Sequence, residues 1–85
     1  MAKPITARSS RTLSPEMAFG QVLREVREIR NISQEELAAR AGYHRTYIGQ
    51  LERGEKSPSL RTIFNLSSAL EVRPSALIRR VERSM

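Results

Sequence analysis

Apolar side chains recur at helical spacing from residue 14 onwards, and no segment shows the alternation that is typical of a strand. In the first run they stand at i, i+4 and i+7, with two further positions that widen the stripe. The run follows Ser14-Pro15-Glu16, which supplies an N-cap, a proline at the first helical position and a first-turn acid. The pattern therefore predicts a helix over residues 15–30 that ends at Asn31. Its apolar positions are Phe19, Val22, Leu23, Val26 and Ile29.

Two short helices joined by a tight turn are predicted next. Ser33 and Glu36 have the spacing of a capping box at the start of the first of them. Gly42 ends this helix, because glycine adopts the left-handed conformation at little cost. The second short helix covers about 45–53 and ends before Gly54. Its apolar positions are Tyr47, Ile48 and Leu51.

Two more helices complete the pattern. Ser57-Pro58 predicts the start of a mostly buried fourth helix, and Arg73-Pro74 predicts the start of a fifth. Residues 1–13 carry basic side chains without a hydrophobic period, so we expect a mobile basic arm before a single domain over residues 14–85. The predicted fold class is all-α, with five helices. The apolar positions of the last two are Leu60, Ile63, Phe64, Leu66, Ala69 and Leu70, then Leu77, Ile78 and Val81.

The charge of the chain indicates a class of binding partner rather than a fold. Fifteen Lys and Arg face nine Asp and Glu, which gives a formal net charge of +6, and 13 of the 15 are Arg. The planar guanidinium matches phosphates and guanine edges, so the bias favours nucleic acid over general solubility. The alternative is a merely basic, soluble protein.

Composition also excludes several classes of function. The chain has no Cys, one His and no Asp, which excludes disulfides, thiolate chemistry and most metal sites. No acid–base or nucleophilic constellation and no phosphate-cradling glycine loop is visible, so we expect neither an enzyme nor a cofactor. No apolar run approaches the roughly 20 residues that span a bilayer. The predicted compartment is the cytoplasm.

The two short helices have the arrangement that places a second helix in the major groove of DNA. Ala38 is small where the helices cross, and Ile48 and Leu51 anchor the second helix from beneath. This anchoring leaves five positions on the outward face: Arg45, Thr46, Gly49, Gln50 and Arg53.

At these residues the chain resembles the Cro/C1-type (XRE) family of helix-turn-helix regulators, which share a compact, lambda-repressor-like fold. The resemblance covers roughly residues 17–80. Controller proteins of restriction–modification systems are the best-fitting subgroup, because of Arg45-Thr46-Tyr47-Ile48 at the start of the recognition helix. Repressors of phage type and plasmid-borne regulators fit almost as well. The matching stretches are 33–38, Gly42, 47–54, 57–60 and 69–72.

Base contacts are expected from the early part of the recognition helix. Arg45 suits guanine O6 and N7, or else a phosphate, and Gln50 suits adenine N6 and N7. Thr46 could meet a phosphate or a thymine methyl. Gly49 either lets the helix approach DNA closely or is an indifferent surface position.

Phosphate contacts are expected around this helix, although a general positive rim would differ little energetically. The resemblance implies that the amide of Gln34 binds a phosphate at a helix N-terminus. It also implies a structural ion pair between Arg27 and Glu52, which links the first helix to the recognition helix. The expected phosphate contacts are Ser33, Gln34, Tyr47, Arg53, Lys56, Ser57, Ser59 and Arg61.

A single domain of this size reads few base pairs, so we expect a homodimer on a pseudo-palindromic operator with half-sites about 34 Å apart. Ile78 and Val81 either form the dimer contact or complete the core. The four aromatic residues, Phe19, Tyr43, Tyr47 and Phe64, are expected in the core rather than as stacking platforms.

The predicted regulator binds double-stranded DNA and either blocks RNA polymerase or contacts it, with no small-molecule ligand and no membrane partner. Three alternatives remain at this point. One is a DNA-binding antitoxin, or the interaction module of a toxin–antitoxin pair. RNA binding is disfavoured because aromatic platforms on a sheet are missing. Membrane-surface binding is disfavoured because the apolar side of the last helix is needed elsewhere.

Overall fold

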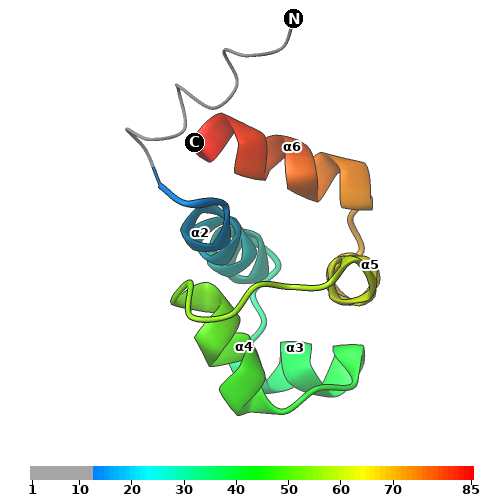
Figure 1. The fold of residues 1–85 in the computed structure, drawn as a ribbon. Helices are drawn as coiled ribbons and strands as arrows, with labels where there is room; N and C mark the ends of the chain where they lie inside the picture. Colours follow the sequence, from blue (N-terminus) through cyan, green and yellow to red (C-terminus); the bar gives the residue numbers. More distant parts are fainter. Residues whose placement is uncertain (1–12) are drawn as a thin grey trace, which may run out of the picture.

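The computed structural model describes residues 13–85, and all of its regular structure is helical. These residues form five helices, which confirms the predicted all-α fold for this part of the chain (Figure 1). The predicted basic arm, residues 1–13, lies outside the described residues apart from Leu13. The helices are α2 (Pro15–Ile29), α3 (Gln34–Ala41), α4 (Arg45–Glu52), α5 (Leu60–Leu70) and α6 (Pro74–Ser84).

Serine side chains begin three of these helices. Ser14 Oγ accepts from the Met17 N–H at 3.1 Å, and Ser33 Oγ accepts from the Glu36 N–H at 3.0 Å. Of the predicted capping box, the bond from the Glu36 N–H to Ser33 is therefore present. The carboxylate of Glu36 instead pairs with Arg40 at 2.6 Å. At the other end of α3, Gly42 has φ 84°, the left-handed conformation predicted for this stop.

The start of α5 differs from the prediction. Residues 57 and 58 lie in the loop, and the helix begins at Leu60 with Ser59 as its N-cap. Ser59 Oγ accepts from the Thr62 N–H at 3.0 Å. Because the later serine satisfies a free helical N–H, it sets the boundary, and Pro58 stays outside the helix.

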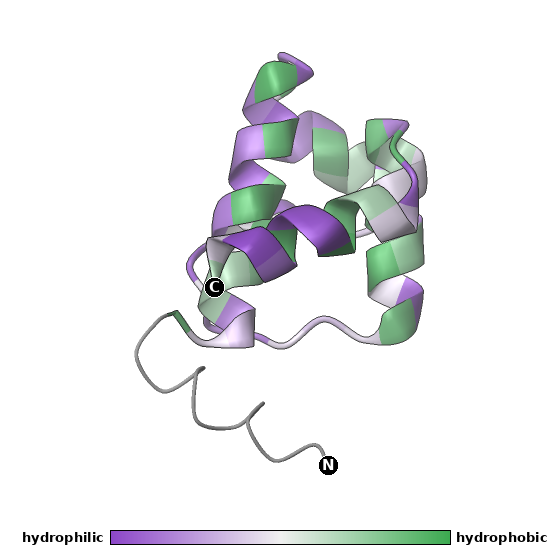
Figure 2. Cartoon of the chain, turned by 90° about the horizontal axis from the view of Figure 1, so that it is seen from above, coloured by the Kyte–Doolittle hydropathy of each residue, from purple (hydrophilic) through white to green (hydrophobic). Residues whose placement is uncertain are grey.

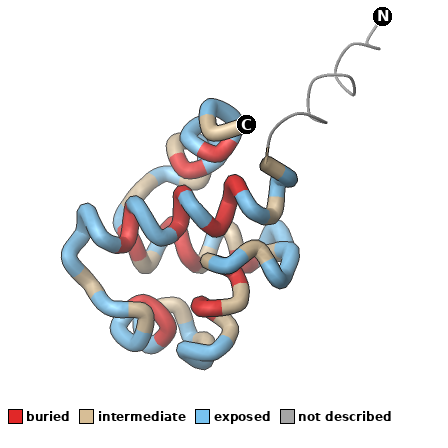
Figure 3. The backbone as a smooth tube through the Cα atoms, turned by 90° about the vertical axis from the view of Figure 1, so that its left-hand side faces the viewer, coloured by how far each residue is buried: buried red, intermediate tan, exposed pale blue. Residues whose placement is uncertain are grey.

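The core gathers around α2. This helix packs against α6 on one side and α4 on the other, while α3 packs against α4 and α5, as Figure 1 shows. Figure 3 shows the buried stretches turned towards this shared interior. None of the helices between residues 13 and 85 combines the length and the apolar run that crossing a membrane requires. The buried apolar residues are Ala18, Phe19, Val22, Leu23, Val26, Leu37, Ala38, Ile48, Leu51, Leu66, Leu70, Leu77 and Val81.

Three apolar positions that were predicted to be buried are exposed. Ile29 is 68% exposed at the end of α2, and Leu60 and Phe64 on α5 are 72% and 54% exposed. Apolar residues occupy more of the α5 surface than the core can cover. The buried side of α5 carries Thr62, Leu66 and Leu70, so positions 60 and 64 turn away from it. Figure 2 shows this mixture of apolar and polar residues around the helices.

Gly20 permits the closest approach between α2 and α4. A Cβ atom at this position would lie 2.4 Å from the Leu51 carbonyl oxygen and 2.6 Å from that of Glu52. Both atoms belong to the backbone of α4, so they cannot turn aside. The glycine therefore fixes how deeply α4 is seated on α2.

Candidate nucleic-acid interface

The orientation of α4 separates an anchored side from a presented side. Ile48 and Leu51 are fully buried, while Arg45 and Thr46 are exposed. Gln50 is half-buried. Gly49, which was expected on the outward face, is buried instead: a Cβ there would lie 3.1 Å from Nη1 of Arg53, so that side chain covers it. The first turn of α4 is thus presented to solvent by anchors one turn further along.

Arg27 and Glu52, the expected ion pair, join α2 to the end of α4. Arg27 Nε donates to Glu52 Oε2 at 2.6 Å and Nη2 donates to Oε1 at 3.0 Å. A further bond runs from Nη1 to the Ile32 carbonyl oxygen at 3.0 Å. The hydrogen bond to Glu52, helped by its negative charge, raises the pKa of Arg27 against the opposing effect of burial. The side chains are 11% and 4% exposed, so this pair is part of the packed interior.

Gln34 connects this ion pair to the presented side of α4. Its Nε2 donates to Glu52 Oε1 at 2.9 Å, and its Oε1 accepts from Arg45 Nη1 at 3.0 Å. A carboxylate only accepts hydrogen bonds, so the amide of Gln34 must turn its NH2 group towards Glu52. Its carbonyl oxygen is then directed at Arg45. We call this chain of contacts, Arg27–Glu52–Gln34–Arg45, the Arg27–Arg45 relay; it runs from the buried ion pair to the exposed Arg45.

A surface hollow beside the Arg27–Arg45 relay brings several arginines together. Arg24, Arg45 and Arg53 all contribute to its lining. Arg24 was not singled out from the sequence, although a basic residue one turn before Arg27 on the same helix was the signal that could have found it. Guanidinium groups around a hollow form a setting for phosphate. Its other lining residues are Arg27, Ser33, Gln34, Glu35 and Glu52.

Arg53 is held by an acidic neighbour just after α4. Its Nε donates to Glu55 Oε2 at 2.7 Å and its Nη2 to Oε1 at 3.3 Å. This hydrogen bonding raises the pKa of Arg53 and lowers the pKa of Glu55. Both side chains are more than half exposed, so the guanidinium remains accessible beside the presented face.

A group of hydroxyl side chains, which we call the hydroxyl cluster, lies between the start of α4 and the start of α5. Thr62 Oγ1 is 3.3 Å from the hydroxyl oxygens of both Tyr43 and Tyr47, and 3.0 Å from Ser59 Oγ. Asn65 Nδ2 donates to the Tyr43 hydroxyl at 2.9 Å. The two tyrosine rings lean against each other with centroids 5.1 Å apart. Sequence reasoning missed Thr62 and Asn65, because neither stands in an outward or motif position.

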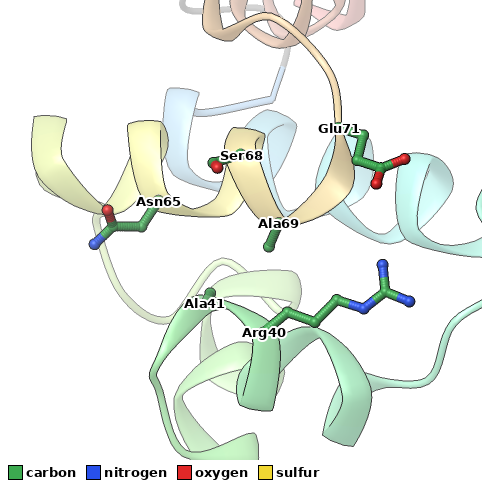
Figure 4. A pocket seen from close by; sticks show the side chains of 6 residues that line it. All are labelled: Arg40, Ala41, Asn65, Ser68, Ala69 and Glu71. Carbon is green, nitrogen blue, oxygen red and sulfur yellow. The ribbon is translucent and has the colours of Figure 1, made fainter.

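The remaining expected phosphate contacts lie at the rim. Lys56, Ser57 and Arg61 are exposed, as are both serine N-caps, Ser33 and Ser59, while Tyr47 is half-buried. A second hollow, between α3 and α5, is shown in Figure 4. None of its lining residues is expected to contact DNA. They are Arg40, Ala41, Asn65, Ser68, Ala69 and Glu71.

The two residues proposed for dimer contact lie in different settings. Val81 is 8% exposed and belongs to the core of its own chain, whereas Ile78 is 41% exposed. Leu60 and Phe64 lie on the neighbouring helix. We call Leu60, Phe64 and Ile78 the α5–α6 apolar patch. The expected burial of Phe64 is therefore wrong for a single chain, while Phe19 is buried and the two tyrosines are partly buried against the core.

A helix-turn-helix family model matches residues 23–77 of the chain, from the middle of α2 into α6. The chain belongs to this helix-turn-helix family. Control protein C.BamHI of Bacillus amyloliquefaciens is 44% identical over 63 residues, which are 73% of this chain and 78% of that protein. The expected similarity to controller proteins of restriction–modification systems is confirmed.

Solved structures extend the similarity to the fold. The controller protein C.AhdI from Aeromonas hydrophila has a TM-score of 0.70 at 44% identity, covering 72% of this chain and 92% of that chain. The C.Esp1396I controller protein, a tetramer in complex with its 35 base-pair operator, has a TM-score of 0.78 at 21% identity. That match covers 85% of this chain and 95% of the other and speaks for the fold alone.

Proposed function

We propose that this helix-turn-helix protein is a sequence-specific regulator that binds double-stranded operator DNA through α4. The observation that carries the proposal is the burial of Ile48 and Leu51 beneath an exposed Arg45. A short helix anchored in this way can enter the major groove with its first turn against base edges. Arg45 is the base-reading residue that the proposal depends on most.

Base reading is shared by the neighbours of Arg45 on α4. Thr46 is exposed in the same turn, and Gln50 is half-buried one turn later. Gly49 would contribute its backbone rather than a side chain, once the Arg53 side chain that covers it turns to a phosphate. Phosphate contacts from Ser33, Gln34 and Arg24 on one side, and from the rim at Lys56, Ser57 and Ser59 on the other, would fix the helix in the groove. The further expected phosphate contacts are Tyr47, Arg53 and Arg61.

Two copies would bind one operator. The α5–α6 apolar patch supplies an exposed apolar surface outside the DNA-reading turn, as a self-complementary contact between identical subunits requires. Ile78 stays in the proposed contact. Val81 supports it from within the core of each chain.

The protein would regulate transcription by occupying its operator. We propose that the dimer occupies a site near a promoter and either blocks RNA polymerase or contacts it, with occupancy set by protein concentration. The expected partners are duplex DNA and a second copy of the chain, and the expected compartment is the cytoplasm. No catalytic step is part of the proposal.

Selection of binding sites from random duplex DNA tests the proposal. The wild-type protein should select a pseudo-palindrome, and Arg45→Ala should lose preference at one base pair of each half-site. A bidentate base contact is worth about 1–3 kcal/mol of discrimination, or roughly five- to 150-fold. The control is Arg83→Ala, which removes the same charge from an exposed position on α6. Equal base preferences in both variants would contradict base reading by Arg45.

A further inference from the structure

The hydroxyl cluster joins the DNA-reading helix to the helix that carries the α5–α6 apolar patch. Close backbone approaches within residues 13–85 join α4 to α2 and α3, and join α5 to α3 and α6. The hydrogen bond between Tyr47 and Thr62 ties α4 directly to α5 across this arrangement. A side chain in this position can affect how the two helices are oriented relative to each other.

Thr62 is the centre of the cluster. Its hydroxyl can donate one hydrogen bond and accept two, so it can satisfy its three hydroxyl neighbours, Ser59, Tyr43 and Tyr47, at the same time. The residue is 5% exposed, which shields these bonds from competing water. Replacing this one oxygen would therefore release the Tyr47 hydroxyl from α5 and leave Tyr43 with only its bond to Asn65.

The same helix presents the apolar patch on its other side. Leu60 and Phe64 are each two residues from Thr62, and two residues on a helix correspond to a turn of about 200°. Leu60 and Phe64 are exposed while Thr62 is buried, as this geometry requires. Thus α5 has one side available to a second subunit and the opposite side bonded to the recognition element.

The recognition helix needs this support at its start. His44 is the N-cap of α4 and makes no side-chain capping bond, in contrast to the serine caps of α2, α3 and α5. Tyr43 immediately precedes the cap and Tyr47 lies in the first turn. The hydroxyl cluster therefore holds the turn that carries Arg45 and Thr46 from the side of α5.

We propose that Thr62 is a positioning residue that transmits the geometry of the dimer to the recognition helix and so sets which half-site spacing the protein accepts. The inference rests on the proposed function. One base pair moves a half-site by about 3.4 Å and turns it by about 34°. A rigid tie between the dimer contact and α4 penalises that mismatch, whereas a loosened tie lets α4 reorient and accept it.

The test compares Thr62→Val with Thr62→Ser. Valine keeps the shape and removes the hydroxyl, while serine keeps the hydroxyl. Affinities are measured for the selected operator and for duplexes whose half-sites are one base pair closer or further apart. We expect Thr62→Val to reduce the wild-type preference for the selected spacing by about two- to tenfold, the range that one hydrogen bond carries. Thr62→Ser should retain the preference.

Two controls separate positioning from folding. Sedimentation should give wild-type dimer formation for Thr62→Val, because this residue faces away from the α5–α6 apolar patch. If the valine variant does not fold, Tyr43→Phe removes one hydroxyl neighbour and leaves Thr62 in place. It should weaken the spacing preference in the same direction by a smaller factor.

An unchanged spacing preference, or an equal loss of affinity on all three duplexes, would overturn the role of Thr62 and leave the proposed function standing. A wild-type protein that selects no duplex sequence would overturn the proposed function, and this inference with it. Flattened spacing preference in Thr62→Val, restored in Thr62→Ser, would support the inference.

Discussion

Arg53 lies at the edge of the proposed DNA interface and has two competing partners, a DNA phosphate and Glu55. It is expected to contact a phosphate, yet in the free protein its guanidinium binds the carboxylate of Glu55 at 2.7 Å. Exposed ion pairs contribute little to folding stability, because water solvates both partners well. Glu55 therefore restrains a DNA-binding side chain at little benefit to the fold, and adds a negative charge beside the phosphates.

Replacing Glu55 with Gln should increase affinity for operator DNA. The change frees Arg53 and removes a repulsive charge, so we expect a gain of about two- to fivefold at low salt. The gain should shrink as salt screens the charges. A salt series of binding measurements, with melting temperatures for both proteins, checks this expectation. Glu82→Gln on α6 is the control, and an equal gain there would indicate an effect of net charge alone.

At the scale of the helices, the position of α4 on α2 depends on Gly20 and on the buried ion pair of the Arg27–Arg45 relay. Gly20 lets the backbones of α2 and α4 approach, and the relay bonds the end of α4 to α2 at the same crossing. Removing one partner of a buried ion pair leaves the other charge without compensation. Changes at Gly20 or in the Arg27–Glu52 pair should therefore disturb DNA binding through the fold, without replacing a base-reading residue.

Gly20→Ala should lower stability. Its Cβ would lie within 2.6 Å of two carbonyl oxygens of α4, and strain of this kind costs about 1–3 kcal/mol in packed interiors. We expect the melting temperature to fall by about 4–8 °C per kcal/mol of net loss. Gly49→Ala is the matched control, because its Cβ would meet only the flexible end of Arg53. Thermal unfolding of both variants should give opposite or clearly unequal shifts, and equal shifts would contradict the tight crossing.

The helix boundaries show what the sequence can and cannot predict. The starts at Pro15, Gln34 and Pro74 follow from caps and prolines that can be read directly, whereas the start at Arg45 follows only from the apolar spacing after Gly42, because His44 makes no capping bond. The predicted start of α5 is too early, because a serine–proline pair two residues before Ser59 has the same local signature. Which of the two serines accepts a hydrogen bond from a free helical N–H depends on the conformation of the loop. The local sequence does not specify that conformation.

The contacts of the site show a similar division. Apolar spacing was sufficient to predict that Ile48 and Leu51 face inward and that Arg45 faces outward. The bond between Gln34 and Glu52 joins residues 18 apart, and the tie between Tyr47 and Thr62 joins residues 15 apart. No local pattern specifies such pairings, because they depend on how the helices cross. The crossing at Gly20 was missed for the same reason.

For the whole molecule, the exposed apolar residues of α5 and α6 are the main departure from a self-contained domain. Phe64 was expected in the core because its spacing on α5 matches that of buried residues. Its 54% exposure is instead consistent with a surface that a second subunit covers. Hydrophobic spacing identifies the residues to be buried, but it does not distinguish a core from an interface.

Phe64→Glu should therefore weaken the dimer without unfolding the chain. Burying a phenyl side chain is worth about 1.5–3 kcal/mol, so we expect the dimer dissociation constant to rise at least about tenfold. Sedimentation over a concentration series measures this change, and circular dichroism verifies the helical content. Ile29→Glu is the control, because Ile29 is 68% exposed on α2, outside the α5–α6 apolar patch. Dimers equally stable in both variants would refute the assigned surface.

The Arg27–Arg45 relay also limits how operator preference can evolve. Glu52 fixes the amide of Gln34 so that an oxygen faces position 45. A new side chain at position 45 that donates hydrogen bonds, such as Lys or Gln, can bind this oxygen. The carboxylate of Asp or Glu only accepts hydrogen bonds and cannot bind it. Turning the amide over would set its oxygen against Glu52. New specificities at this position are thus expected among donor side chains, unless residue 34 changes first.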